Sequence, residues 1–446
     1  MQKCEYSARE VLKFTIPMVL TSLSFSLMFN VDRMVLAHYS LDSMNAAALA
    51  GNFVAMISFV VIAIAQIATV FVGQYNGLGE YRKTGWAPWQ MIYLGIMSFV
   101  LFVPIAIFCH HFSLFPKHYE EEGLAYMRIL TYFAGLQAIY AALSAFFIGR
   151  GQSSIIICVV LFANMVNLIA DILLVFGYEG VIEPLGIKGA AIATIISELT
   201  SIIILLIIFI NKENREKYST FDNKFRKDLF FNCIKTGFPM SCGKVLSLLG
   251  WFILLSIYNR ISKDLATLES FAISMWIIFM FFAEGGGRAL SSMSANLIGE
   301  NNLPGIKKLL KLFLNFNTVV CIFFSIPLIF YHDIMFWFME GVNGDISHLH
   351  SDFRFLFVSM WIIIFMDGIF YMVCGILNSG GDTKFPTYVE LSTLWFGVVA
   401  PTVALYLTGN LTSIRFTYTL IPLAGIVNSV VAYRRYNQFK WFNRLV

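Results

Sequence analysis

Long apolar stretches, each of about the length of a membrane-spanning helix, constrain this chain more than any other feature. Lipid offers the backbone no hydrogen bonds, so a segment that crosses it as a helix needs roughly 20 mainly apolar residues. We count twelve such stretches in the 446 residues. They lie near 11–38, 46–72, 88–112, 124–148, 153–177, 189–210, 231–258, 267–298, 306–331, 354–378, 385–408 and 413–433. The sequence therefore predicts an all-α membrane protein with twelve transmembrane helices.

The balance of apolar and charged residues supports this prediction. Hydrophobic residues make up 58% of the chain and charged residues 13%, whereas about 25% of residues are charged in soluble domains. A soluble protein of this size could not cover its surface with so few charges. The composition argues against a soluble enzyme, a disordered chain and a secreted protein held together by disulfides.

The distribution of Lys and Arg predicts the orientation. With the N-terminus in the cytoplasm, 20 of these residues fall in segments inside the cell and 6 in segments outside it. This bias is the one that cytoplasmic loops of membrane proteins show. We therefore expect an even number of spans, with both termini in the cytoplasm.

A charged stretch at residues 211–228 lies at the midpoint of the chain and separates two sets of six apolar stretches. Similar short segments recur at an offset of 222, as in Ile16–Met18 and Phe238–Met240. We predict two pseudo-symmetric six-helix lobes, 1–210 and 231–446, joined by a cytoplasmic linker at 211–230. Parallel repeats of this kind are common in transporters, and a central cleft near mid-membrane is the expected binding site.

Asp32 is an ionisable residue deep in the first apolar stretch, where a charge is costly and therefore indicates function. Thr21, Phe25 and Met28 precede it by eleven, seven and four residues and lie on the same helical face. A carboxylate beside an aromatic ring and a thioether suits a lipophilic cation. The alternative is an ion pair with the adjacent Arg33.

The fifth and sixth stretches carry further polar residues. Asn164, Asn167 and Asp171 share one face of the fifth stretch, because they are three and four residues apart. They need either an aqueous cavity or a partner helix. In the sixth stretch, small residues from Gly189 favour close helix packing, and Thr194 could offer an oxygen to a cation.

In the second half, Asp367 lies in the middle of an apolar stretch without a local partner, which makes it a candidate for the binding site. Gln137 occupies the matching place in the first half, 230 residues earlier. Glu284 and Arg288 are four residues apart and can neutralise each other.

The sequence lacks the motifs of zinc proteases, α/β-hydrolases and P-loop proteins. Three histidines and three glutamates between His110 and Glu122 could hold a metal, but a solvated loop is the expected reading. We therefore expect no enzyme activity, no metal and no cofactor, and any uphill transport needs an ion gradient or another subunit.

The order and spacing of several segments resemble the multidrug and toxic compound extrusion (MATE) family of cation-coupled antiporters, from about residue 13 to 433. The matching segments are GQYNGLGE, GRGQSS, NLIADILLVFG, PLGIKGAAIAT and ILNSGGDTKFP, together with Pro17 and Asp32 in the first stretch. The resemblance implies the same fold of two six-helix lobes.

The resemblance also implies residue roles. Asp32, Asn167, Asp171 and Thr194 would form the site of the coupling cation, H⁺ or Na⁺, in the first lobe. Asp367 matches an acid of the second lobe, but Ser247 stands where an acid of the seventh helix is expected. The expected substrate cavity includes Phe25, Met28, Asn164, Gln137 and Asp367.

The expected function is secondary antiport by alternating access, exporting organic cations or drugs in exchange for H⁺ or Na⁺. The expected location is the plasma membrane, or the inner membrane of a bacterium. We expect a monomer whose partners are small organic cations and the lipid bilayer, and no nucleic acid.

Two alternatives remain open. A lipid-linked-saccharide flippase of the same superfamily would need a strongly basic central cavity, and few Lys or Arg lie at mid-depth, chiefly Lys244 and Arg288. An intramembrane aspartyl protease would use two of the acids. The Gly380-Gly381-Asp382 run is similar to its motif, but Ser379 replaces the first glycine and Asp382 falls in a predicted cytoplasmic loop.

Overall fold

The computed structural model describes residues 6–111, 115–330 and 349–446. Within these ranges the chain is built of helices, and the one β-bridge found there joins Tyr178 to Ile182. Ten of the described helices are long and apolar enough to cross a membrane. The number rises to eleven if the bent pair α5 (Glu120–Phe133) and α6 (Gly135–Gly149) is counted as one span. The prediction of an all-α membrane protein is confirmed.

The ninth predicted span, 306–331, corresponds to α12 (Leu303–Phe323) and the short helix α13 (Ile326–Ile329). Helix α12 carries three lysines near its start, which reduce its apolar character. The predicted end of this span, residue 331, lies outside the described residues.

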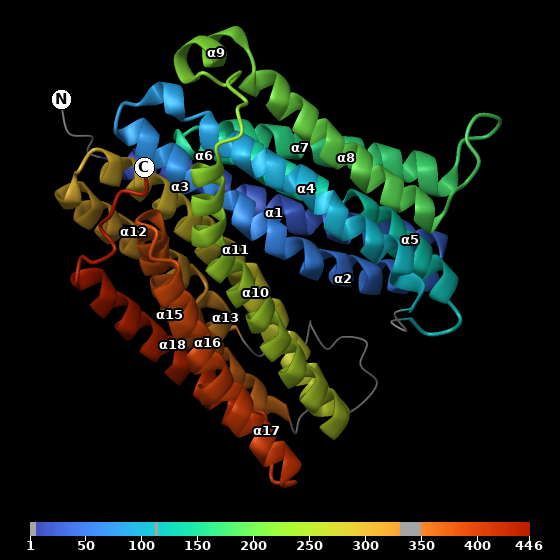
Figure 1. The fold of residues 1–446 in the computed structure, drawn as a ribbon. Helices are drawn as coiled ribbons and strands as arrows, with labels where there is room; N and C mark the ends of the chain where they lie inside the picture. The colour runs from blue at the N-terminus through green and yellow to red at the C-terminus, as the bar shows by residue number, and fades with distance from the viewer. Residues whose placement is uncertain (1–5, 112–114, 331–348) are drawn as a thin grey trace. The chain divides into compact units, whose positions relative to one another are not determined.

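The helices of the first half follow one another with short connections (Figure 1). Helix α2 stops at Gln66, and α3 continues the same predicted span from Ala68. In chain order, besides α5 and α6, they are α1 (Ala8–Tyr39), α2 (Leu41–Gln66), α3 (Ala68–Gly77), α4 (Trp86–Phe108), α7 (Ser153–Phe176), α8 (Ile187–Phe209) and α9 (Lys212–Tyr218).

The second half is built in the same way. The eleventh predicted span is divided into α16, the π-helical segment η4 and α17, and Pro401 lies at the start of α17. Besides α12 and α13, the helices are α10 (Lys227–Ile261), α11 (Lys263–Gly299), α15 (His350–Ser379), α16 (Lys384–Ser392), η4 (Thr393–Val399), α17 (Ala400–Leu407) and α18 (Arg415–Asn437).

The described residues form two compact units. The N-terminal unit comprises Lys13–Cys242, Ala295–Asn301 and Arg444–Val446. The C-terminal unit comprises the described residues of Met1–Leu12, Gly243–Ser294 and Asn302–Asn443. Each unit therefore takes short segments from the far half of the chain.

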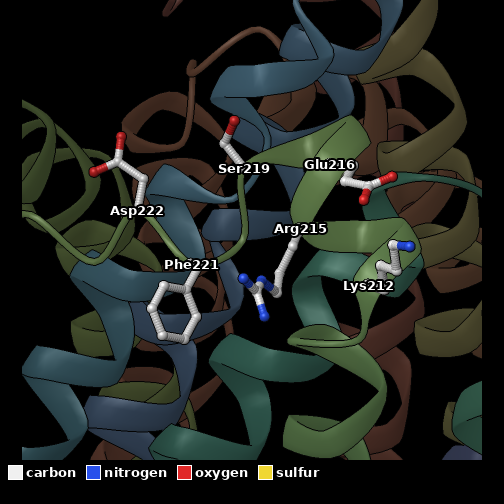
Figure 2. A pocket seen from close by; sticks show the side chains of 6 residues that line it. All are labelled: Lys212, Arg215, Glu216, Ser219, Phe221 and Asp222. Carbon is white, nitrogen blue, oxygen red and sulfur yellow. The ribbon is translucent and has the colours of Figure 1, made fainter.

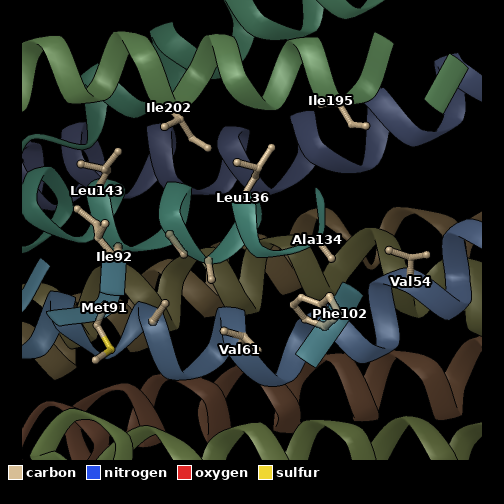
Figure 3. Close-up of a cluster of buried hydrophobic side chains, with 14 of the residues drawn as sticks. Val54, Val61, Met91, Ile92, Phe102, Ala134, Leu136, Leu143, Ile195 and Ile202 are labelled. Atoms are coloured by element: carbon tan, nitrogen blue, oxygen red, sulfur yellow. The ribbon is translucent and has the colours of Figure 1, made fainter. Parts of the chain in front are cut away.

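Each unit has its own apolar core. In the N-terminal unit, side chains from α2, α4, α6 and α8 pack together, among them Val61, Ile92, Leu143 and Ile202 (Figure 3). In the C-terminal unit the core contains aromatic residues such as Tyr258, Phe271 and Phe353. In a lipid bilayer, helices gain no hydrophobic free energy by packing together, so their association depends on such close contacts.

Helices α7 and α8 lie side by side in the N-terminal unit (Figure 1). Gly189 allows this approach, because a Cβ atom at this position would lie 2.5 Å from the backbone oxygen of Leu174. The predicted packing role of the small residues near the start of the sixth span is therefore confirmed. The approach also brings the polar faces of the two helices toward each other.

Residues related by the 222-residue offset meet in the N-terminal unit. A Cβ on Gly77 would collide with the backbone oxygen of Asn296, and a Cβ on Gly299 would collide with that of Gln74. The amide of Asn296 also donates to the backbone oxygen of Gly149 at 2.8 Å. The weak repeat in the sequence thus corresponds to a reciprocal contact between the two related segments.

Candidate functional site

Asp32 of α1 lies in the interior of the N-terminal unit and is 2% exposed. The hydroxyl of Thr194 on α8 lies 3.3 Å from Asp32 Oδ2 and 3.1 Å from the backbone oxygen of Ala190, and it can donate to either. This contact joins residues 162 positions apart. The first and sixth predicted spans therefore meet at a carboxylate.

Arg33 does not compensate Asp32 by direct pairing. Its guanidinium donates instead to the side-chain oxygen of Asn52 at 3.2 Å. Adjacent residues on a helix point in directions about 100° apart, which accounts for the separation. The structure therefore does not contain the alternative, an ion pair between Asp32 and Arg33.

Asn167 and Asp171 complete the group from α7. Both are buried, at 1% and 0% exposed, and both face the carboxylate of Asp32, as does Thr194. The structure thus brings together the four residues that the resemblance implied for a cation. We refer to Asp32, Asn167, Asp171 and Thr194 as the carboxylate cluster.

Several polar atoms of the carboxylate cluster have no hydrogen-bond partner among the described residues. They are Asp32 Oδ1, Asn167 Nδ2 and both carboxylate oxygens of Asp171. Burying an unpaired polar atom is costly, and two carboxylates that face each other in a dry interior repel. A proton or a metal cation between them would remove both costs.

The residues predicted for the substrate cavity have different surroundings. Met28 is buried, and its sulfur lies 4.0 Å from the hydroxyl of Ser197. Asn164 donates to the backbone oxygen of Ser24 at 3.1 Å and so fixes α7 against α1. The side chain of Phe25 lies outside the described residues.

Gln137 of α6 donates to Oε1 of Glu198 at 2.8 Å. Glu198 was not predicted, although it follows Thr194 by four residues and shares its helical face. Thr194 and Glu198 line a narrow hollow between α1, α2, α5, α6 and α8. Its lining consists of Phe29, Gly51, Val54, Ala55, Leu130, Gln137, Thr194, Ile195 and Glu198.

Tyr126 of α5 was also missed by the sequence analysis. It is buried, its hydroxyl interacts with Thr194, and it lies within the electrostatic range of Asp32 and Asp171. A tyrosine in a predicted helix gives no sign in the sequence that it faces a carboxylate on another helix. Its phenol adds a hydrogen-bonding group beside the carboxylate cluster.

Asp367 belongs to the C-terminal unit and has partners there. The indole of Trp276 donates to Asp367 Oδ2 at 3.1 Å. Glu284 and Arg288 approach to 3.8 Å, as predicted from their spacing. Ser247, which stands in place of the expected acid of the seventh helix, donates to Glu390 at 3.3 Å.

Lys244 lies within the electrostatic range of both Glu284 and Glu390. The C-terminal unit therefore combines three carboxylates with two cationic side chains, Lys244 and Arg288. We refer to Lys244, Glu284, Arg288, Asp367 and Glu390 as the mixed-charge cluster.

Asp382, which the protease alternative would require, is engaged elsewhere. Its Oδ2 atom lies 2.7 Å from Nε of Arg435, in an ion pair between the turn after α15 and the end of α18. A carboxylate neutralised in this way is unsuited to activating water.

The region from His110 to Glu122, considered for a metal, is only partly described. His118 approaches Asp42 to 3.8 Å, and Glu122 accepts a bond from Ser43 at 2.5 Å. No group of three or more metal-binding side chains occurs in the described ranges.

A larger hollow of about 540 Å³ opens at the surface of the linker. Lys212, Arg215, Glu216, Ser219, Phe221 and Asp222 line it (Figure 2). Asp222 accepts bonds from Arg226 at 2.6 Å and from the indole of Trp86 at 3.1 Å. Burial acts to raise the pKa of Asp222, but the bond and charge of Arg226 outweigh it and keep this pKa below its usual value.

The linker hollow therefore holds exposed charges that are partly paired, whereas the carboxylate cluster holds buried carboxylates with no Lys or Arg paired to them among the described residues. Buried, unpaired ionisable groups in a membrane protein are the stronger indication of function. We take the carboxylate cluster and the adjoining narrow hollow as the candidate site.

Comparison with known proteins agrees with the predicted fold. The MatE family model matches residues 17–173 and 239–402. The probable multidrug resistance protein YoeA of Bacillus subtilis (strain 168) is 23% identical over 401 residues, which cover 87% of this chain and 84% of that protein.

Solved structures give the same result. The structure of a MATE protein in complex with MaL6 matches with a TM-score of 0.83 at 13% identity, over 98% of each chain. The eukaryotic MATE transporter AtDTX14 matches with a TM-score of 0.80 at 17% identity, over 97% of this chain and 96% of that one. These relatives are named for multidrug resistance and for transport rather than for an enzyme activity, as the sequence predicted.

Proposed function

Because the chain belongs to the MatE family, we propose that it is a multidrug efflux antiporter that exports organic cations in exchange for H⁺ or Na⁺. YoeA, 84% of whose length the match covers, is named for multidrug resistance. The observation that carries the proposal is the carboxylate cluster, in which two buried acids face each other without a compensating partner among the described residues.

The coupling ion binds at Asp32 and Asp171. A proton on one carboxylate would turn their repulsion into a hydrogen bond, and Na⁺ would accept oxygens from both. Asn167 and Thr194 supply two more oxygens, which a hard cation prefers. The residues present thus fit either ion.

The substrate is a cation that competes with this ion. An organic cation that enters from the cytoplasm is attracted by the same negative charge, and Met28 on the same face of α1 offers an apolar, polarisable contact. When an ion from outside neutralises Asp32, the attraction for the substrate falls and it is released. By linkage, the substrate weakens ion binding by the same factor.

Alternating access of the two lobes exposes the site first to the cytoplasm and then to the outside. The Lys and Arg bias supports cytoplasmic termini. The similarity to a bacterial multidrug resistance protein supports a place in the plasma membrane, or in the inner membrane of a bacterium. The protein acts as a monomer, since each chain carries its own complete carboxylate cluster.

The test is dye efflux from lipid vesicles that contain the purified protein, with proton and Na⁺ gradients imposed separately. One gradient should drive uphill movement of a cationic dye. Asp32→Asn should abolish this movement, while Glu216→Gln, the same change at an exposed position of α9, should leave it unchanged. Uphill efflux at the wild-type rate from Asp32→Asn would contradict the proposal.

A further inference from the structure

Glu198 has no role in the proposed exchange, although among the acids without such a role it is the nearest in sequence to the carboxylate cluster. It lies on α8 between Ile195 and Ile202, which both point into the apolar core (Figure 3). Spacings of three and four residues put Glu198 on the same face as these residues. Its carboxyl group is therefore directed toward the interior and away from lipid.

Glu198 and Thr194 are joined by the narrow hollow that both side chains line. This hollow has room for about one water molecule at most, so it cannot admit an organic cation. Three of its lining residues, Gly51, Val54 and Ala55 of α2, are small or apolar. The hollow thus suits the passage of a proton along one water better than substrate binding.

The carboxylate cluster itself has little contact with solvent. Asp32 and Asp171 are 2% and 0% exposed, whereas Glu198 is only half-buried. A proton that reaches Asp32 needs a route through groups that can both accept and donate. Glu198, one water and the hydroxyl of Thr194 form such a series, because a hydroxyl does both.

We propose that Glu198 is a proton-loading site that passes protons through Thr194 to the Asp32–Asp171 pair. The inference rests on the proposed antiport and commits its coupling ion to H⁺. In one transfer, protonated Glu198 gives its proton to the water in the hollow, and the water gives one to Oγ1 of Thr194. The hydroxyl proton of Thr194 moves to Asp32 Oδ2. Glu198 is left ionised, Asp32 is protonated, and water and Thr194 are unchanged.

The surroundings of Glu198 favour proton exchange over metal binding. Gln137 presents its amide N–H to the carboxylate, so its oxygen points elsewhere. The oxygens left are too few to replace the hydration shell of a metal cation. The titratable groups on the Thr194 side are Asp32 of α1, Asp171 of α7 and Tyr126 of α5, with Arg33 acting on Asp32. The residues of α2 and α6 that line the hollow carry no titratable side chain.

The test measures the initial rate of dye efflux from vesicles under an imposed pH gradient, at external pH from 5 to 8. Glu198→Gln should lower this rate about tenfold or more, as expected for loss of a proton-transfer group. The loss should be smaller at low external pH, because protons in solution replace the relay. Formate, a small diffusible acid, should restore several-fold activity, and Glu198→Asp should retain part of it.

Equilibrium dye binding and thermal stability of Glu198→Gln should match those of the wild type, because the carboxylate cluster is intact. Glu216→Gln is the matched control and should behave as the wild type throughout. A wild-type rate and pH profile in Glu198→Gln would overturn the inference. A loss that formate does not relieve, with impaired dye binding, would also overturn it and indicate a structural role.

The experiment separates this inference from the antiport on which it rests. If Asp32→Asn loses ion-driven efflux and Glu198→Gln does not, antiport stands and the relay fails. If only a Na⁺ gradient drives efflux, antiport again stands and the relay fails. If Asp32→Asn retains full ion-driven efflux, the proposed function itself fails.

Discussion

The carboxylate cluster of the N-terminal unit and the mixed-charge cluster of the C-terminal unit bury acids in opposite ways. In the N-terminal unit, Asp32 and Asp171 face each other, and among the described residues no Lys or Arg pairs directly with either of them. In the C-terminal unit, Glu284 lies beside Arg288 and Lys244, and Asp367 accepts a bond from Trp276.

The two clusters obtain their compensating charge from different sources. A buried carboxylate is stable when it is paired or hydrogen-bonded, and costly otherwise. The mixed-charge cluster contains its own cations, so it does not depend on an ion from solution. The carboxylate cluster has no such cation and must obtain it from the coupling ion or the substrate.

The largest expected effect on efflux comes from neutralising one of the two acids of the carboxylate cluster. Asp32→Asn should reduce ion-driven efflux by about 100-fold, which corresponds to roughly 3 kcal/mol of lost coupling energy. The amide resembles the carboxyl group in shape but binds neither proton nor Na⁺ in the same way. Vesicle efflux assays measure this, and yield in the membrane serves as the control for folding. If Asp32→Asn kept more than half of the wild-type rate of ion-driven efflux, the contrast between the carboxylate cluster and the mixed-charge cluster would not hold.

The oxygen of Thr194 should matter less than the charge of Asp32. Thr194→Val keeps the volume and loses the hydroxyl that lies 3.3 Å from Asp32 Oδ2. Hydrogen bonds to charged groups contribute about 1.5–3 kcal/mol, so ion affinity should fall roughly tenfold or more. Thr200→Val is the matched control, because the Thr200 hydroxyl donates to the backbone oxygen of Ile196 on the same helix. Equal effects of the two variants, measured by ion titration of efflux, would contradict this role.

A substitution that removes a cation should make the mixed-charge cluster depend on an external cation, as the carboxylate cluster does. Lys244→Met removes a cation from the mixed-charge cluster and leaves Glu390 and Glu284 less compensated. This variant should take up about one additional proton or Na⁺ per protein, because an external cation then replaces the ammonium group. Ion uptake by purified protein in the Asp32→Asn background isolates the effect. Unchanged uptake would show that Lys244 is not the compensating charge.

A compensated carboxylate at the surface should give the smallest effect. The pKa of Asp222 is held below its usual value, so its bond with Arg226 stabilises the folded linker above the unfolded pKa. This stabilisation is lost as the pH falls through the lower, folded pKa. The side chains are 31% and 22% exposed, and solvent screening limits the contribution to less than about 1 kcal/mol. In the wild type, the rate of proteolysis of the linker should rise as the pH is lowered from 7 to 3. In Asp222→Asn this rate should be high over the whole range.

The sequence was sufficient to predict the carboxylate cluster in part. Helical spacing put Asn167 and Asp171 on one face, and the cost of a charge in lipid identified Asp32. Thr194 needed the family resemblance, because a threonine after small residues has a packing role in most helices. The contact of Asp32 with Thr194 spans 162 residues, and a helical pattern contains no information on such pairs.

Other features depended on tertiary contacts. Glu198 follows Thr194 by four residues, so its spacing places it on the same helical face, but helical spacing alone does not show that it lines a hollow with Gln137 of another helix. Tyr126 could not have been found, because only the packing of α5 against α8 directs it to the cluster. The segment Ala295–Asn301 joins the N-terminal unit through Asn296 and Gly299, and the sequence repeat indicated their equivalence but not their contact.

The most direct test of the account is the number of ions released when a cationic dye binds to the purified protein. A pH indicator and a Na⁺-sensitive probe record this release in weakly buffered detergent solution, without any gradient. We expect the wild type to release about one H⁺ or Na⁺ for each dye cation bound, and Asp32→Asn with Asp171→Asn to release none. Dye binding to the wild type without ion release, or equal release from the double variant, would contradict the claim that the two cations alternate at one pair of carboxylates.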